Sequence, residues 1–372
     1  MRATYIYGAG DIRVINVPDP AIQQPTDAIV RVVRACICGS DLHPYHSMPV
    51  TPGGQSIGHE CVGIVEDTGA DVTSVSQGDL VIVPFAWSDG TCDFCREGLQ
   101  TSCRHGGFWN ANGADGCQAE AIRVPLADGT LVATPVEEDS PLIPSLLTLS
   151  DVYGTGYHAA VKASVSRRTS VTVIGDGAVG LLAVLSARQL GAEQIILMGR
   201  HTARTDLGRE FGATHVIAER GNDGIEKVRE LTGGDGTHVV IEAVGHMPAY
   251  EQAVGVVRPG GVISRVGVPQ YENAQVGFGS LFRAQHHPHR RTRTRPRLHP
   301  DAHARHPRRP GQPRPRLRPR THPRPDPEGI QGNGQQTGPQ GSHSSLTSAL
   351  AGLPHQIPLP HQIPPLRRRH RR

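Results

Sequence analysis

The stretch Val171–Gly180, VTVIGDGAVG, decides the fold of the second half of this chain. A run of apolar and β-branched residues leads into Gly175, Gly177 and Gly180, which follow the spacing G-x-G-x-x-G. The first glycine of this pattern makes a tight turn, the second lets the backbone approach a pyrophosphate, and the third lets a helix pack on a strand. The stretch therefore predicts a strand, a turn and a helix that together bind a dinucleotide.

The residues after this stretch repeat the same alternation. We expect strands in VTVIG, QIILMG, HVIA and HVVIEAVG, and helices in VGLLAVLSARQLG, ARTDLGREFG and GIEKVRELTGG. Strands that alternate with amphipathic helices form βαβ units around a parallel sheet. The pattern indicates an α/β fold, and this context makes the glycine motif specific.

The residues before this stretch have a different pattern. Up to about Pro135, β-branched runs such as RATYI, AIVRVVRA, CVGIVEDTG, GDLVIVP and AEAIRVP are separated by Gly, Pro and Asp. They predict an all-β domain with one long Cys-rich loop. Helical spacing appears first in LLTLSDVYGTGYHAAV, between Ser145 and Val161.

Three segments of this first part carry residues that bind metals. They are CGSDLH at Cys38, GHE at His59, and LSDVYG at Asp151. A catalytic zinc takes three ligands of the Cys, His or carboxylate kind and keeps one position open. Cys38, His59 and Asp151 supply such a set, and zinc lowers the pKa of an alcohol oxygen enough for a hydride to be expelled near neutral pH.

Three neighbours of these ligands have chemistry that fits the same site. Ser40 and His43 follow Cys38, and we expect them to carry the released proton to solvent. We expect Glu60 to act as a partner of the ligands or as an alternate ligand.

Each of these residues has a simpler interpretation when it is taken alone. Cys36, Cys61 and Cys117 are interpreted as buried thiols, and a single Cys after an apolar strand usually is one. His59 alone would be a loop histidine, and Asp151 alone would be a helix cap. The zinc prediction therefore depends on the set.

CGSDLH followed about 20 residues later by GHECVGIV resembles the signature of the medium-chain, zinc-dependent alcohol dehydrogenases. The resemblance runs from Met1 to about Phe282. It implies a GroES-like all-β catalytic domain at residues 1–152, an incomplete Rossmann domain at residues 153–284, and a homodimer or homotetramer. It also implies a small-molecule alcohol or carbonyl substrate.

A second metal site is expected in TCDFCREGLQTSC, where Cys92, Cys95 and Cys103 have the spacing C-x2-C-x7-C. The family has a fourth Cys three residues before the first of these, and this chain has Asp89 there. A carboxylate can ligate zinc, so we expect a structural site of three Cys and one Asp, with a weakened or empty loop as the alternative. A redox pair is disfavoured because C-x-x-C of that kind begins a helix in a βαβ unit.

The cofactor preference depends on the end of the strand QIILM. An NAD site usually has an acidic residue there, and this chain has Gly199 and Arg200. Arginine pairs with a 2′-phosphate, and we expect Gly199 to leave room for it, so NADP is favoured over NAD. The alternative is that Arg200 is a solvated surface charge.

The charge is distributed unevenly. Half of the 38 basic residues, all Arg, and 3 of the 34 acidic residues lie from Arg283 onward. The rest of the chain is therefore acidic, with no sign of a nucleic-acid surface, and no apolar run is long enough to cross a membrane. Seven Cys with no secretory signal favour metal sites or buried thiols in a cytoplasmic protein.

The segment 285–372 is rich in Arg, Pro and His and has few apolar residues, so we interpret it as disordered. It also reads as the same gene in a shifted frame. Gln285–Arg291 can be encoded so that a start one base later gives Asn-Ile-Thr-Leu-Thr-Gly-Gly, which resembles the family's next strand. Gln331–Gln336 similarly gives Lys-Ala-Met-Asp-Asn-Arg, which resembles the closing helix.

We therefore expect a one-base frame error near Phe282, with a genuine basic tail as the alternative. Two hypotheses on function follow. The first is a zinc-dependent oxidoreductase that transfers a hydride between an alcohol and a nicotinamide cofactor. The second is an inactive zinc-binding product of a damaged gene, which lacks the last Rossmann strands and has an open sheet edge.

Overall fold

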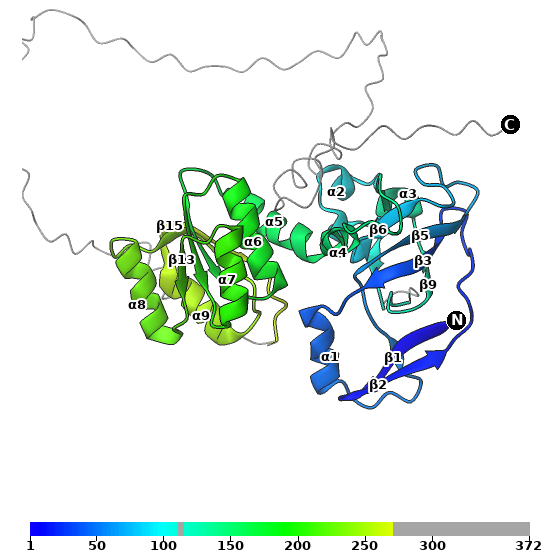
Figure 1. Cartoon of the computed structure of the whole chain (residues 1–372), viewed down its shortest axis with the longest axis horizontal. Helices are drawn as coiled ribbons and strands as arrows, with labels where there is room; N and C mark the ends of the chain where they lie inside the picture. Colours follow the sequence, from blue (N-terminus) through cyan, green and yellow to red (C-terminus); the bar gives the residue numbers. More distant parts are fainter. Residues whose placement is uncertain (111–114, 271–372) are drawn as a thin grey trace, which may run out of the picture.

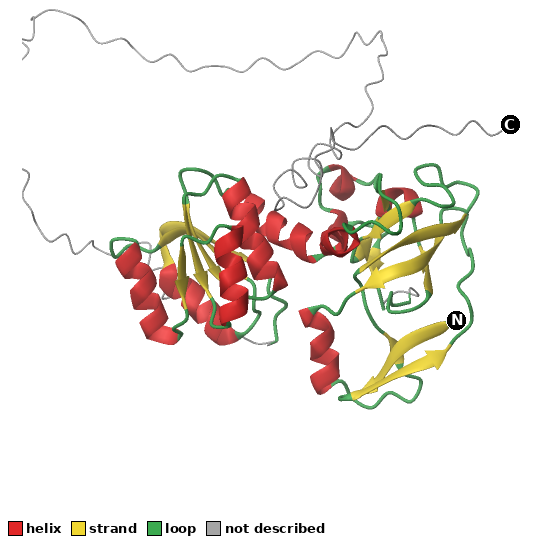
Figure 2. Ribbon diagram, viewed as in Figure 1, coloured by secondary structure: helices red, strands yellow, loops and turns green. Residues whose placement is uncertain are grey.

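A computed structural model describes residues 1–110 and 115–270 of the 372-residue chain. The segment 285–372 and the expected frame error therefore lie outside the described residues. Figure 1 shows two units side by side, joined through α4 (Ile143–Leu147) and α5 (Val152–Lys162). Figure 2 shows that the first unit is mainly strands and loops and that the second has helices around a sheet.

The first unit is built on antiparallel strands, as the sequence predicts. Its central sheet has the order β10-β6-β5-β3-β9, and a smaller sheet has the order β2-β1-β4. The strands are β1 (Arg2–Gly8), β2 (Asp11–Asn16), β3 (Ala28–Ala35), β4 (Gln55–Ser56), β5 (Cys61–Thr68), β6 (Leu80–Val83), β7 (Ala86–Trp87), β8 (Gly107–Phe108), β9 (Ala121–Val124) and β10 (Val132–Ala133). A core that includes Val30, Val65 and Val81 fills one face of the central sheet.

Short helices lie in the loops between the strands of this unit. They are the 3-10 turns η1 (Gly39–Asp41), η2 (Gln100–Ser102) and η3 (Thr148–Ser150), and the helices α1 (Leu42–Ser47), α2 (Asp93–Arg96) and α3 (Ala127–Thr130). Two of them carry site residues, because η1 follows Cys38 and α2 follows Cys92.

The second unit is a five-stranded parallel sheet of order β13-β12-β11-β14-β15. Its strands are β11 (Ser170–Ile174), β12 (Gln194–Met198), β13 (His215–Ile217), β14 (Thr237–Glu242) and β15 (Val257–Arg265), and its helices are α6 (Ala178–Gln189), α7 (Thr202–Phe211), α8 (Gly221–Leu231) and α9 (Met247–Val256). The helices α5 and α6 pack on one face of the sheet, and α8 and α9 pack on the other. This confirms the predicted α/β fold.

The strands β12 and β13 follow β11 on one side of the sheet, whereas β14 and β15 lie on its other side. The order of the strands along the chain therefore reverses between β11 and β14, which are neighbours in the sheet. In sheets of this kind, ligands bind outside the carboxyl ends of the strands at such a point. The glycine turn at Gly175 and the loop at Ala243 follow these two strands. The topology therefore places the predicted dinucleotide turn at the expected ligand position.

The predicted helical stretch between Ser145 and Val161 is broken at Asp151. This residue has φ −149° and ψ −70°, so α4 and η3 end before it and α5 begins after it. In α5, Val152 and Tyr153 pack against Leu182 and Leu185 of α6. Asp151 thus lies where the first unit meets the second, next to the boundary that the sequence analysis sets after residue 152.

Candidate active site and metal centres

The strand pairing of the first unit brings Cys38 and His59 together. Cys38 follows the carboxyl end of β3, and His59 precedes β5. These strands pair antiparallel, with Ala35 opposite Cys61, so the two loops lie side by side. Asp151 precedes α5 and joins these two residues. The donor atoms of Cys38, His59, Glu60 and Asp151 all lie within 4.8 Å of one another.

The distances among these donors fit a metal ion better than hydrogen bonds. Asp151 Oδ2 lies 3.6 Å from Cys38 Sγ and 3.5 Å from His59 Nε2. A tetrahedral zinc with bonds of about 2.3 Å to sulfur and about 2.1 Å to nitrogen or oxygen holds its donors roughly 3.4–3.6 Å apart. A nitrogen–oxygen hydrogen bond would be about 2.9 Å long. The donor set therefore fits one zinc ion.

Asp151 is not acting as a helix cap. It occupies the N-cap position of α5, but its side chain makes no capping bond to the helix backbone. Its Oδ1 instead accepts a hydrogen bond of 2.6 Å from the Thr155 hydroxyl, which leaves Oδ2 facing Cys38 and His59. Thr155 thereby fixes which oxygen is presented to the site.

Asp41 supports two of the predicted ligands. Its Oδ2 accepts the Cys38 backbone N–H at 2.9 Å, and its Oδ1 lies 3.2 Å from His59 Nδ1. Burial alone would lower the pKa of His59, but Asp151 and Asp41 raise it to about 12. Surroundings that favour a proton on this ring also favour a cation at Nε2.

Glu60 is the fourth member of this cluster and is only 1% exposed. Burial and the nearby Asp151 raise its pKa. Within the described residues its Oε2 has no hydrogen-bond partner. A buried carboxylate oxygen without a partner is costly, and a cation at this site would relieve that cost.

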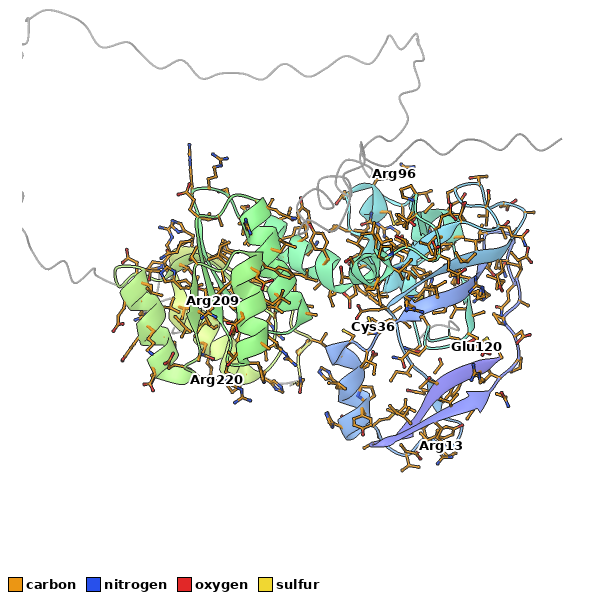
Figure 3. The ribbon with its side chains drawn as sticks, viewed as in Figure 1. Arg13, Cys36, Arg96, Glu120, Arg209 and Arg220 are labelled. Carbon is orange, nitrogen blue, oxygen red and sulfur yellow. The ribbon has the colours of Figure 1, made fainter. Side chains whose placement is uncertain are left out.

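The predicted zinc ligands Cys38, His59 and Asp151 line a cavity of about 540 Å³ between the two units. The first unit contributes Cys38, Ser40, His43, His59, Phe85, Phe108 and Trp109, and the second contributes residues that include Gly177, Val179, Val244 and Val266. The predicted proton carriers and the dinucleotide turn thus share one cavity with the predicted zinc ligands. Figure 3 labels Cys36 at the edge of the first unit that faces the second.

The buried-thiol interpretation holds for Cys61 and Cys117, which are 0% exposed. It is wrong for Cys36, which is only partly buried. Cys36 comes directly after β3, where the chain leaves the sheet, and burial still raises the pKa of its thiol. The raised pKa keeps the Cys36 thiol protonated near neutral pH.

The second predicted site also forms one cluster. The donor atoms of Asp89, Cys92, Cys95 and Cys103 lie within 4.8 Å of one another. Cys92 Sγ lies 3.5 Å from Cys95 Sγ and 3.9 Å from Cys103 Sγ, close to the roughly 3.8 Å between sulfurs around a tetrahedral zinc. Three thiols and a carboxylate at this spacing fit a closed structural site.

The glycine turn has the geometry that a dinucleotide needs. Gly175 has φ +114°, which an L side chain rarely adopts. A Cβ at Gly180 would lie 2.0 Å from the Gly175 carbonyl oxygen, so only glycine allows α6 to start this close to the turn. At Gly177 a Cβ would meet no protein atom within 4 Å, so this face of the turn is open to a ligand.

Gly199, which the sequence predicts to leave room for a phosphate, has a close protein neighbour on its Cβ side. The space beside its Cα is filled by Asp176, since a Cβ there would lie 2.5 Å from Asp176 Cβ. Asp176 Oδ2 accepts the backbone N–H groups of Arg200 and His201, each at 2.9 Å, and contacts the His201 ring. Gly199 is needed for this close approach, and the side chain of Arg200 is exposed.

Comparisons with known proteins agree with this arrangement. The profile of the Alcohol dehydrogenase GroES-like domain matches residues 24–135, and that of the Zinc-binding dehydrogenase matches residues 178–290. A medium chain reductase/dehydrogenase of Acremonium is 35% identical over 277 residues, which are 72% of this chain and 93% of the relative. This chain belongs to the zinc-dependent medium-chain alcohol dehydrogenase family. The second profile continues eight residues past Phe282, where the sequence analysis ends the resemblance.

Solved structures of this family show the same fold. The alcohol dehydrogenase of Thermus sp. ATN1 is 36% identical with a TM-score of 0.68, over 75% of this chain and 81% of that one. A zinc-binding dehydrogenase of Sinorhizobium meliloti bound to NADP is 27% identical with a TM-score of 0.62, over 76% and 82% of the two chains. The chain spans 64% of the zinc-type alcohol dehydrogenase B of Aspergillus flavus, at 35% identity and over 72% of its own length.

Sequence reasoning missed four residues of the candidate sites: Asp41, Thr155, His105 and Asp176. Asp41 was visible three positions after Cys38, and Asp176 was visible inside the glycine motif. Neither has a separate signal, because an Asp in a turn is common. Thr155 and His105 become recognisable only when the fold brings them to Asp151 and Asp89.

Proposed function

We propose that this protein is a zinc- and NADP-dependent alcohol dehydrogenase that interconverts an alcohol with an aldehyde or ketone. The proposal depends mainly on one observation. The first unit contributes a set of donors with the spacing of a zinc site, the second contributes an open glycine turn, and both face the same cavity. Zinc, when bound, would supply a Lewis acid for the alcohol oxygen, and the nicotinamide would accept or give the hydride. The side chains of this protein would hold these groups, orient them and move the proton.

Cys38, His59 and Asp151 would hold the zinc, and Thr155 and Asp41 orient them. Glu60 belongs to the same cluster as an alternate ligand. Cys92, Cys95, Cys103 and Asp89 would hold the structural zinc. Each set contains a carboxylate that the sequence alone leaves open to other interpretations.

Ser40 and His43 line the cavity beside Cys38, where a proton must leave the alcohol. Burial lowers the pKa of His43, and the neighbouring His246 and His46 lower it further. His43 is therefore neutral at pH 7 and can accept a proton. We assign Ser40 as a relay, whose hydroxyl accepts the alcohol proton as it gives its own proton to His43, and we assign His43 as the group that passes this proton to solvent.

Gly175, Gly177 and Gly180 would bind the pyrophosphate at the start of α6. The NADP preference is supported by the exposed basic side chains at the end of β12. The side chains of His201 and Arg204 are 50% and 56% exposed beside Asp176, and Arg200 is exposed next to them. The oxygens of Asp176 face these groups, so Asp176 is not free to take a ribose hydroxyl.

Steady-state rates of the purified protein with a panel of alcohols, each with NADP and with NAD, test this proposal. We expect a higher kcat/KM with NADP, and Arg200→Ala should lower kcat/KM for NADP by about tenfold or more, because one charge-assisted contact contributes about 1.5–3 kcal/mol. Absence of hydride transfer from every alcohol, with both zinc sites filled, would favour the inactive-product hypothesis. An unchanged cofactor preference in Arg200→Ala would refute the role of Arg200.

We also propose that the enzyme acts in the cytoplasm as a homodimer or homotetramer, as members of its family do. Among the described residues, no helix is both long and apolar enough to cross a membrane. Sedimentation analysis would give the oligomeric state, and cell fractionation would give the compartment. Sequencing the coding DNA around Phe282 would test the frame error, and an intact frame with unrelated codons would refute it.

A further inference from the structure

The second zinc site contains an interaction that the three Cys do not explain. Asp89 replaces a thiolate, and a carboxylate is a harder ligand to orient because it offers two oxygens and rotates about its side-chain bonds. Its Oδ1 accepts the backbone N–H groups of Thr91 at 2.8 Å and Cys92 at 3.0 Å. Its Oδ2 lies 2.6 Å from Nδ1 of His105. Both oxygens are thus held by the protein.

His105 is not itself a member of the donor cluster. The four donor atoms within 4.8 Å of one another come from Asp89 and the three Cys. The His105 side chain is 68% exposed, so the ring covers the outer side of Asp89, whose side chain is 10% exposed. With Nδ1 as the donor, Nε2 is left for solvent, and a neutral ring satisfies this geometry.

The segment that carries His105 is fixed on both sides. Cys103, two residues before it, is a member of the cluster. Arg104 makes two bonds to Asp93, at 2.9 and 2.7 Å, and its guanidinium lies over the ring of Phe94. Gly106, one residue after it, passes so close to β7 that a Cβ there would lie 2.2 Å from the Trp87 carbonyl oxygen. The ring of His105 therefore meets Asp89 from a constrained backbone.

We infer that His105 is a positioning residue for Asp89, which it holds in the orientation that closes the second zinc site. The imidazole holds one carboxylate oxygen, and the two backbone N–H groups hold the other. This interaction lets a longer, two-oxygen side chain serve where the family has a thiolate. Partners of this kind typically change metal affinity by about 10–100-fold when they are removed.

This inference rests on the structural zinc that is part of the proposed function, but not on catalysis. Zinc affinity is measured on the full chain in a Cys38→Ser background, so that the retained zinc belongs to the second site. Competition with a chromophoric chelator gives the affinity, and atomic emission gives the zinc per chain. Loss of alcohol oxidation by itself has no bearing on the result.

The variants are His105→Ala, His105→Asn and, as a matched control, His158→Ala, which removes an exposed imidazole from α5. We expect His105→Ala to weaken zinc binding at least tenfold and His158→Ala to leave it unchanged. His105→Asn should restore most of the affinity, because an amide nitrogen can take the place of Nδ1 as the donor.

A double-mutant cycle separates positioning from general stabilisation of the loop. In an Asp89→Cys background there is no carboxylate to orient, so His105→Ala should have little further effect on zinc affinity. The same loss in both backgrounds would overturn the inference. So would unchanged affinity of His105→Ala, equal loss in His105→Asn and His105→Ala, or absence of zinc from the second site of the parent protein.

Discussion

Asp41 connects to His59 through Oδ1 and Nδ1, 3.2 Å apart, and its other oxygen accepts the backbone N–H of Cys38. One carboxylate thus orients two predicted zinc ligands that are 21 positions apart in the sequence. Such a carboxylate fixes the ring tautomer with Nε2 free for the metal. Asp41 is 7% exposed, so water cannot easily replace it.

Replacement of Asp41 by Ala should therefore weaken the catalytic zinc. We expect a fall in zinc affinity of about 10–100-fold, with a matching loss of activity at limiting zinc. Zinc per chain, measured after dialysis against graded chelator, checks this. Asp67→Asn, an exposed carboxylate on β5, is the control and should retain its zinc. Equal zinc content in the two variants would contradict the role of Asp41.

Replacement of Cys38 by Ser should abolish turnover and leave dinucleotide binding intact. The reason is that Cys38 belongs to the donor cluster, whereas the glycine turn lies on the other unit. Rates and cofactor titration by fluorescence measure the two properties separately. Cys36→Ser is the matched control, because this thiol lies two residues away and outside the cluster. Residual activity in Cys38→Ser would remove the zinc mechanism.

Much of the fold was predictable because the signals are local. The run from Val171 to Ile174 has the β-branched composition of a buried parallel strand, and the glycines after it are required by φ +114° at Gly175 and by the tight contact at Gly180. The break at Asp151 was not predictable from helical spacing. Its φ of −149° and ψ of −70° separate η3 from α5 where the two units meet, and no local pattern reports this break.

The two metal clusters were predictable as sets, but their supporting groups were not. Cys92 and Cys95 are close in sequence, so their spacing carries the signal. Thr155 and His105 act through partners that tertiary structure supplies. The close neighbour of Gly199 was not predictable for the same reason, since the side chain on its Cβ side comes from Asp176, 23 positions earlier.

Two glycines of the dinucleotide turn should respond differently to Ala. Gly177→Ala meets no protein atom, so we expect unchanged stability and about tenfold or greater loss of cofactor affinity. Gly180→Ala places a methyl group 2.0 Å from a carbonyl oxygen, and we expect a loss of about 2–4 kcal/mol in unfolding free energy. Thermal unfolding and cofactor titration distinguish the two.

A third glycine provides the control for this pair. Gly154 lies in α5 and is exposed, and a Cβ there would meet nothing within 4 Å. Gly154→Ala should increase stability by about 0.5–1 kcal/mol because Ala favours the helix. Loss of stability in Gly177→Ala equal to that in Gly180→Ala would contradict the open face of the turn.

Asp176 should make a pH-dependent contribution to stability. Burial alone would raise its pKa, but the bonds from His201 and Arg200 outweigh burial and lower the pKa. A carboxyl whose pKa is lower in the folded protein stabilises the fold above its unfolded pKa of about 3.9, and this contribution is lost as the pH falls through the folded value. Thermal unfolding of Asp176→Asn should thus occur at a lower temperature than that of the parent at neutral pH. The difference should shrink below about pH 4, and a difference that grows with acidity would show that Asp176 is not stabilised as a carboxylate.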